Sequence, residues 1–154
     1  MFLKDKREKM MKFGSVALVT LCLLGTMMAQ SHTNNEVTVV ITNVESYGGS
    51  IVIGFYATPE DYANFSNPVF SKVLRPKKGQ SLQFVTTKLK PGEFAVAGYH
   101  DLNDNGKLDF GGPYNAPNEP LIFGNNAKGL YGAPEYDETL MKVSGNKTTI
   151  ELSF

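Results

Sequence analysis

Residues 101–109 read Asp-Leu-Asn-Asp-Asn-Gly-Lys-Leu-Asp, and this spacing is typical of a calcium-binding loop. Counted from the first Asp, side-chain oxygens fall at positions 1, 3, 5 and 9, and Gly at position 6 allows the sharp turn. Alternate residues of such a loop direct their oxygens at one hard cation, and position 7 lends its backbone carbonyl. The candidate ligands are therefore Asp101, Asn103, Asn105, Lys107 and Asp109.

The loop is not a complete EF-hand, because position 12 is Gly112 where a bidentate Glu is needed. Glu119 is the nearest carboxylate that could complete the site. The alternative is that Asp, Asn and Gly form a tight turn through hydrogen bonds from side chain to backbone. The spacing favours calcium if any cofactor is bound, and we expect no organic cofactor.

His100 immediately precedes this loop, at the end of the apolar run 94–99. It is either part of a site at the end of the sheet or a half-buried histidine bonded to the loop. The chain has no Gly-x-Ser-x-Gly motif, and its other histidine, His32, lies near the N-terminus, so a catalytic triad has little support. A pair of carboxylates that catalyses glycoside hydrolysis is a further interpretation of the acidic residues, although acids beside Asn and Gly suit cation binding better than proton transfer.

A third motif, residues 118–134, contains Asn125, Asn126 and Tyr131. The two amides could hold an Ω-like loop closed by bonding to backbone groups. They could equally present hydrogen-bonding groups to a sugar or a peptide, with Tyr131 as a platform. His100 and these three residues are the candidate ligand surface.

The elements that must position these residues are strands, because alternation of apolar and polar residues dominates the chain. We expect an all-β fold: an antiparallel β-sandwich of about seven strands, either prealbumin-like or immunoglobulin-like. Thr58-Pro59-Glu60-Asp61 predicts one short helical turn, since Thr can cap a helix and Pro suits its first position. The strands are expected within residues 36–43, 50–56, 80–89, 94–99, 140–143 and 148–154, with a hairpin turn at 46–49 and a second pairing across 144–147.

Residues 101–138 depart from this pattern, because 20 of these 38 residues are Gly, Pro, Asn or Asp. A loop this long inside a small domain is usually functional or disordered. The stretch also carries ten large apolar or aromatic residues, which argues against disorder. We expect one long ordered loop that packs over one end of the sandwich.

The N-terminus predicts export. Residues 1–12 carry five Lys/Arg, residues 13–28 carry no charge, and Ala29 follows, which is the pattern of a secretory signal peptide. We expect residues 1–29 to be removed, 30–35 to form a flexible linker and 36–154 to form one domain. The protein would then be periplasmic, associated with the outer membrane or extracellular, without stable membrane insertion after cleavage.

Composition limits the partners. Residues 30–154 carry 10 Lys/Arg against 13 Asp/Glu, a net charge of −3, and no Trp. Nucleic-acid binding is therefore not expected, because it needs concentrated positive charge. The single cysteine, Cys22, lies in the signal segment, so the exported domain has no disulfide and no cysteine-bound metal.

The motifs in series resemble the bacterial family catalogued as domain of unknown function 2141. The resemblance rests on Pro-Gly-x-Phe-Ala-Val-Ala, His-Asp-x-Asn-x-Asn-Gly-Lys-Leu-Asp, Glu-Pro, Phe-Gly-Asn-Asn-Ala-Lys-Gly and Gly-Ala-Pro, in that order. It implies a small exported domain without an established activity. The expected function is a non-enzymatic, cation-stabilised binding or interaction module of the cell envelope, with an envelope protein or glycan as partner. The alternative is a small envelope hydrolase that uses His100 and the acidic loop.

Overall fold

The first of two facing sheets has three strands in the order β10–β1–β4. The computed structural model describes residues 35–154, so the predicted signal peptide and most of the linker lie outside the described residues. β1 pairs antiparallel with β4 and, unexpectedly for a sandwich predicted to be antiparallel, parallel with β10. The strands of this sheet are β1 (Val37–Thr42), β4 (Leu82–Thr86) and β10 (Thr148–Ser153).

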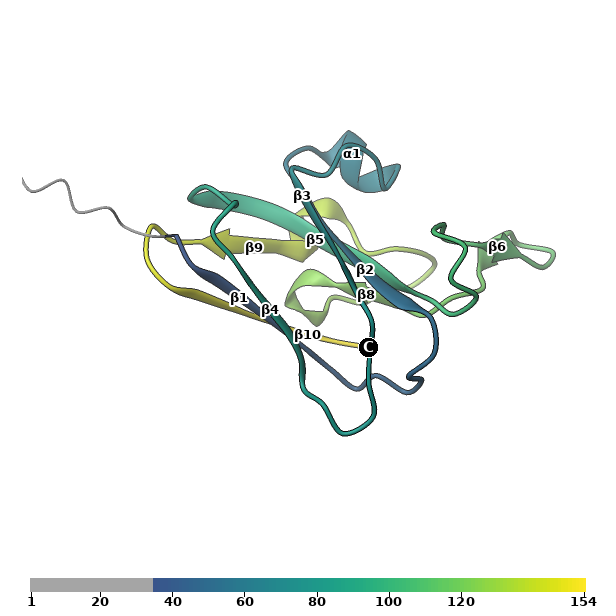
Figure 1. Ribbon diagram of the computed structural model, residues 1–154. Helices are drawn as coiled ribbons and strands as arrows, with labels where there is room; N and C mark the ends of the chain where they lie inside the picture. The colour runs from purple at the N-terminus through teal and green to yellow at the C-terminus, as the bar shows by residue number, and fades with distance from the viewer. Residues whose placement is uncertain (1–34) are drawn as a thin grey trace, which may run out of the picture. The chain divides into compact units, whose positions relative to one another are not determined.

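The second sheet has the order β3–β2–β5–β8, and β9 pairs with the first half of β5 (Figure 1). All its pairings are antiparallel. Its strands are β2 (Ser50–Tyr56), β3 (Phe70–Leu74), β5 (Gly92–Asp101), β8 (Leu121–Phe123) and β9 (Leu140–Val143). With the first sheet it confirms the predicted all-β, sandwich-like fold.

Two predicted pairings are wrong. Residues 46–49 do not turn a hairpin, because β1 and β2 lie in different sheets and the connection crosses between them. β9 does not pair with β10 across residues 144–147: it pairs with β5, and β10 pairs with β1. Alternation of apolar and polar residues indicates which face of a strand turns inward, but it carries no information about which strand is the neighbour.

The short helix predicted at Thr58 is confirmed as α1 (Pro59–Ala63). The Thr58 hydroxyl accepts a hydrogen bond from the backbone nitrogen of Asp61 at 3.2 Å. Pro59 lies in the first turn, where the backbone N–H that Pro lacks would have no partner within the helix. Two 3₁₀ turns, η1 (Gly124–Asn126) and η2 (Tyr136–Thr139), and the two-residue strands β6 (Phe110–Gly111) and β7 (Ala116–Pro117) lie within or next to residues 101–138. The expectation of one uninterrupted loop over these residues is wrong, because β8 divides them and pairs with β5 in the second sheet.

β5 is the central strand and is buried on both faces, as its continuous apolar run predicts. Val96 faces the core between the two sheets, together with Ile53 and Ile150. Ala95 and Ala97 face outward into a second cluster, which α1 and η2 cover with Tyr62 and Tyr136. β5 ends at Asp101, so a rigid strand buried on both sides delivers the first residue of the candidate calcium loop.

Candidate functional site

Asp101 organises the loop that follows β5. Only 1% of this residue is exposed, and both carboxylate oxygens accept backbone hydrogen bonds. Oδ1 accepts from the nitrogen of Asn105 at 3.0 Å, and Oδ2 accepts from the nitrogen of Gly106 at 2.7 Å. Gly106 has φ +79°, the left-handed conformation that Gly adopts at little cost. The loop therefore turns sharply around the Asp101 carboxylate.

The other predicted ligands gather on the same loop. Oδ1 of Asn103 accepts from the nitrogen of Asn105 at 3.1 Å, and Oδ1 of Asn105 accepts from the nitrogen of Lys107 at 2.9 Å. The amide nitrogens of both asparagines donate to Oδ2 of Asp109, at 2.7 Å and 2.8 Å. The structure thus brings four predicted side chains together, and two amide groups contact the Asp109 carboxylate where a cation would be expected.

Glu119 lies beside the loop, although ten residues separate it from Asp109. Its side chain is buried, with 7% exposure, and it accepts from the nitrogens of Leu102 at 3.0 Å and Asp109 at 3.3 Å. Both oxygens are therefore used to join the two ends of the loop. Burial, followed by the charges of Asp101 and Glu119, raises the pKa of the adjacent Tyr99.

Asp104 points away from the other acids of the loop. It accepts a hydrogen bond from the Ser50 hydroxyl, and Nη2 of Arg75 lies 2.8 Å from its Oδ2. The Ser50 hydrogen bond and Arg75 hold the pKa of Asp104 below its usual range. No motif in the sequence marks this contact, because Ser50 is 54 residues away in the chain. Asp104 attaches the loop to the second sheet and is not directed at the candidate cation position.

The ring of His100 is bonded to the connection between β1 and β2, and not to the loop that follows His100, which is the partner that one interpretation of the sequence predicts. It is 2% exposed, and its Nε2 lies 2.8 Å from the carbonyl oxygen of Gly48. Its backbone nitrogen donates to the Pro120 carbonyl at 2.9 Å, and its ring lies 6.0 Å from that of Phe154. His100 therefore joins three separate segments at one end of the sandwich.

Asn125 and Asn126 both bond to backbone groups. The Asn125 amide nitrogen donates to the carbonyls of Glu138 at 3.1 Å and Leu140 at 2.9 Å. Oδ1 of Asn126 accepts from the nitrogen of Ser153 at 2.8 Å. The alternative in which these amides hold the loop closed accounts for both side chains.

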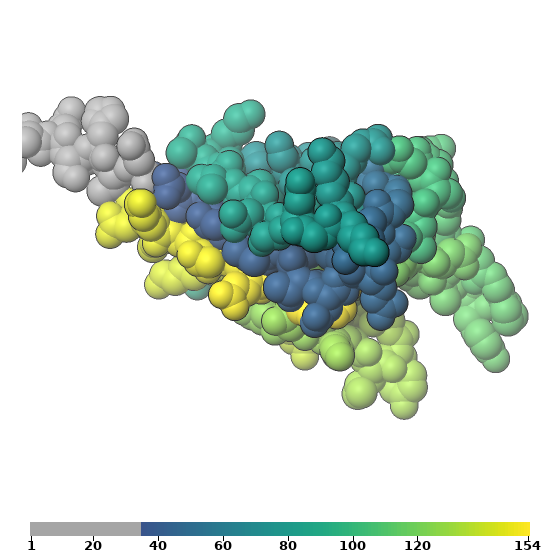
Figure 2. All heavy atoms as spheres, turned by 60° about the horizontal axis from the view of Figure 1, so that its bottom comes forward, coloured from purple at the N-terminus to yellow at the C-terminus, as the bar shows by residue number. Residues whose placement is uncertain are grey.

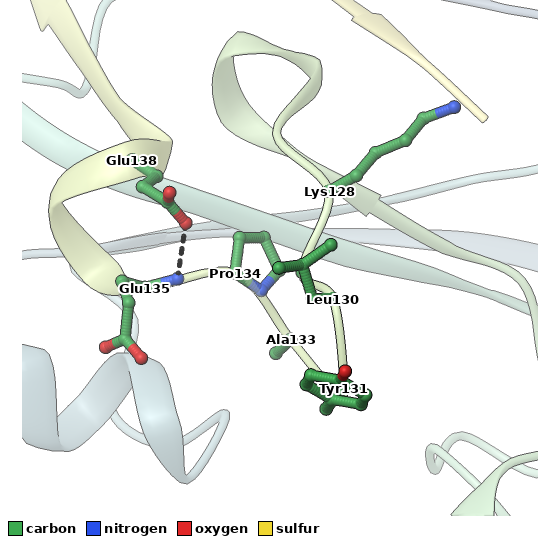
Figure 3. Close-up of a pocket in the computed structure, with 9 residues that line it drawn as sticks. Lys128, Leu130, Tyr131, Ala133, Pro134, Glu135 and Glu138 are labelled. Atoms are coloured by element: carbon green, nitrogen blue, oxygen red, sulfur yellow. Dashed lines mark hydrogen bonds between the residues drawn. The ribbon is translucent and has the colours of Figure 1, made fainter.

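Tyr131 lies on a projecting segment, residues 127–135, that is drawn in Figure 3. This residue and Leu130 are fully exposed, at 103% and 92%. The base of the segment is fixed: Glu138 accepts from the nitrogen of Glu135 at 3.0 Å, as Figure 3 shows, and Tyr62 donates to the Pro134 carbonyl at 2.8 Å. An anchored base therefore supports an apolar, solvent-exposed tip.

The long loop forms a second projection at residues 110–117, which carries Tyr114 with 91% exposure. Figure 2 shows the two projections, green and yellow-green, extending from the body of the domain. A contiguous exposed apolar patch, in contrast to a single exposed side chain, marks a candidate interaction surface. The two tips form the most exposed apolar surface in residues 35–154.

Among residues 35–154, no group of three or more His, Cys, Asp or Glu side chains lies close enough to hold a metal ion. The candidate set consists of two carboxylates, two amides and one backbone carbonyl. This donor set is all oxygen, which suits calcium, but its charge is low.

The comparisons agree with the resemblance noted in the sequence. A family model described as "Uncharacterized protein conserved in bacteria", domain of unknown function 2141, matches residues 39–151. The chain belongs to this family. Searches of curated proteins and of solved structures found no match. Within the described part of the chain, no helix has the length and apolar character needed to cross a membrane.

Proposed function

We propose that the protein is an exported interaction module of the bacterial cell envelope, in which a cation stabilises the 101–109 loop. The module presents the adjoining end of the sandwich to an envelope protein or glycan. Export rests on the basic and apolar start of the sequence. The remaining parts of the proposal rest on the geometry of the loop and on its two exposed tips.

Cation binding is supported by one observation: Asp101, Asn103, Asn105 and Asp109 converge on one turn. Asp101 accepts backbone donors at positions 5 and 6 of the turn, and its carboxylate oxygens have further lone pairs for a cation. A cation would replace the two asparagine amides as the partner of Asp109, and both asparagines would turn their oxygens toward the ion. This exchange breaks the two hydrogen bonds to Asp109 and disturbs the two in which the asparagine oxygens accept from backbone nitrogens, so we expect weak binding, with a Kd of about 10⁻⁴ to 10⁻³ M.

Glu119 acts as a clamp on the loop, whether or not it also contacts a cation. Its two oxygens accept from the nitrogens of Leu102 and Asp109 and so join the two ends of the loop. The clamp keeps the loop closed on β5. In the chain, the projection at 110–117 comes before β8 and the projection at 127–135 comes after β8. Ordering of the loop and display of the tips are thereby linked.

The alternative, a small hydrolase, would use His100 as its base. In the structure Nε2 of His100 faces a backbone carbonyl, and within residues 35–154 no hydroxyl or carboxylate hydrogen-bonds to the ring. A base needs such a contact to activate a nucleophile. The substitution His100→Ala separates the two functions, because it removes turnover from a hydrolase and leaves the tips of a binding module in place.

The interaction surface is tested by photo-crosslinking in the native host. A photoreactive residue is introduced at Tyr131, and a matched control carries it at Glu151, which is exposed on β10 and belongs to neither projection. We expect adducts with an envelope component from position 131 and none from position 151. Equal crosslinking at the two positions, or none at position 131, would contradict the proposed surface.

A further inference from the structure

Positive charge is concentrated in residues 69–90, although the net charge of residues 30–154 is −3. This stretch carries six of the ten Lys/Arg of residues 30–154 and none of their 13 Asp/Glu. The six cations are Lys72, Arg75, Lys77, Lys78, Lys88 and Lys90, and all of them are exposed. The domain therefore has one basic segment on an otherwise acidic surface.

The fold places this segment on one side of the sandwich. The segment contains β3, which is an edge strand of the second sheet, and β4, which is an edge strand of the first. The rings of Phe70 and Phe84, 6.1 Å apart, join the two strands. Figure 2 shows the segment in teal, apart from the tips of both projections. We call this side of the domain, formed by residues 69–90, the basic side.

The fold leaves most of this charge without an acidic partner. Arg75 is paired with Asp104, but within residues 35–154 no carboxylate lies within 4.0 Å of any of the other five cations. A cluster of exposed like charges produces a positive potential, which attracts anionic partners. The basic side is therefore a candidate surface for an anionic partner.

Apolar surface lies among the cations at one end of the basic side. Val69 is 52% exposed, and it lines a depression of about 230 Å³ together with Leu89 and Phe94. Lys88 and Lys90 line the same depression, and both are exposed. An apolar hollow beside two ammonium groups suits an amphiphile, because its anionic head can meet the lysines while its apolar part enters the hollow.

Three kinds of partner could neutralise the basic side: an acidic protein that adds a strand to β3, a soluble polyanion, and an anionic lipid surface. Lys72 disfavours strand addition, because it shares the inward face of β3 with Phe70 and Leu74, and an inward-pointing charge on an edge strand opposes further pairing. A soluble polyanion, such as a nucleic acid or an acidic glycan, would leave the apolar hollow in water. A lipid surface matches both features, because its headgroups are anionic and its interfacial region accepts apolar groups.

We propose that the basic side binds an anionic phospholipid surface. The lysines meet the lipid phosphates, and the hollow beside Val69 lies at the boundary between headgroups and acyl chains. The contact is peripheral and leaves the tips of both projections free. The inference goes beyond the proposed function, because it needs neither a cation in the 101–109 loop nor a partner at the tips.

The test measures co-sedimentation with phosphatidylcholine vesicles that contain either no phosphatidylglycerol or about 30% of it. The protein is taken from its native host, so that every variant has the N-terminus that the cell leaves. We expect tighter binding to the anionic vesicles, and this binding should weaken as salt screens the charges.

A matched pair of double variants assigns the binding to the basic side. Lys88→Gln with Lys90→Gln should weaken binding to the anionic vesicles about 25-fold, because each Lys near such a surface contributes about five-fold. Lys107→Gln with Lys128→Gln makes the same change in net charge outside the basic side, so the affinity should stay within about three-fold of that of the unmodified protein. All four side chains are exposed, so both double variants should fold.

Spin-labelled phosphatidylglycerol in the vesicles locates the contact. It should weaken the amide NMR signals of Val69, Lys88 and Lys90 more than those of Tyr114 and Tyr131 at the tips. The proposal is overturned by absent binding to the anionic vesicles, by equal binding to the two kinds of vesicle, by equal losses in the two double variants, or by signals that weaken first at the tips. Binding of soluble polyphosphate as tight as that of the anionic vesicles would also overturn it, and would indicate a site for soluble polyanions.

Discussion

Glu119 offers the sharpest test of how the long loop is held. Its carboxylate accepts from the nitrogen of Leu102 at 3.0 Å and from that of Asp109 at 3.3 Å, and the side chain is 7% exposed. Glu119→Ala removes both acceptors and leaves two backbone donors without partners. A hydrogen bond to a charged group contributes about 1.5–3 kcal/mol.

The second hydrogen bond is long and partly open to water, so we assign it about 1 kcal/mol, and the first about 2 kcal/mol. The expected loss in the free energy of unfolding is therefore about 3 kcal/mol for Glu119→Ala. For a domain of this size that loss lowers Tm by about 10 °C. Glu119→Gln keeps one acceptor but turns an amide donor toward the other backbone nitrogen, so we expect a loss of about 2 kcal/mol.

Thermal unfolding followed by circular dichroism measures these losses, and Glu151→Gln on the exposed face of β10 is the control, expected within about 0.5 kcal/mol of the unmodified protein. Amide hydrogen exchange locates the effect: protection should fall at Leu102 and Asp109 in both Glu119 variants. If Glu119→Ala unfolded at the same temperature as the control, or kept its protection at these two amides, the clamp would be refuted.

Three further predictions concern other parts of the chain. The Ser50 hydrogen bond and Arg75 lower the pKa of Asp104, so this contact stabilises the fold above the ordinary Asp pKa and its contribution is lost as the pH falls through the lowered value. Asp104→Asn should therefore flatten the dependence of Tm on pH in that acid range, and an unchanged dependence would contradict the proposed contribution of Asp104. Gly49→Ala should destabilise the fold by about 3 kcal/mol or more in denaturant unfolding, because φ is +69° and the added Cβ would collide with a carbonyl oxygen of β5; a loss under about 1 kcal/mol would contradict this. Intact mass of the protein from its native host should place the mature N-terminus near Gln30, and a full-length mass would exclude cleavage.

Local features of the fold could be predicted because they depend on neighbouring residues. The cap at Thr58 and Pro59 needs only four residues, and α1 begins where they place it. The apolar run 94–99 predicted a strand covered on both faces, and β5 has the core on one face and the tyrosine cluster on the other. The strand partners could not be predicted, because β1 and β10 lie at opposite ends of the described chain and alternation does not specify a neighbour.

In the candidate site, too, the local features could be predicted from the sequence, and the contacts between distant segments could not. The spacing of residues 101–109 is local, and the structure brings its predicted side chains onto one turn. The contact of Asp104 with Ser50 and Arg75 joins segments that are distant in the sequence, and no motif marks it. The role of Asn125 also depends on the fold, because its amide bonds to carbonyls 13 and 15 residues away.

Stabilisation of the 101–109 loop by a cation is measured by thermal unfolding of metal-stripped protein with and without 5 mM calcium, about ten times a mid-range Kd for such a site. At that ratio the linkage gain is about 1.4 kcal/mol, so Tm should rise by about 3–6 °C. The rise should be absent in Asp101→Ala and Asp109→Ala and kept in Asp104→Ala, since Asp104 faces Ser50 and Arg75. An unchanged Tm in the unmodified protein would show that the loop is a turn held by its own hydrogen bonds, and loss of the rise in all three variants would indicate diffuse binding of charge instead of a site.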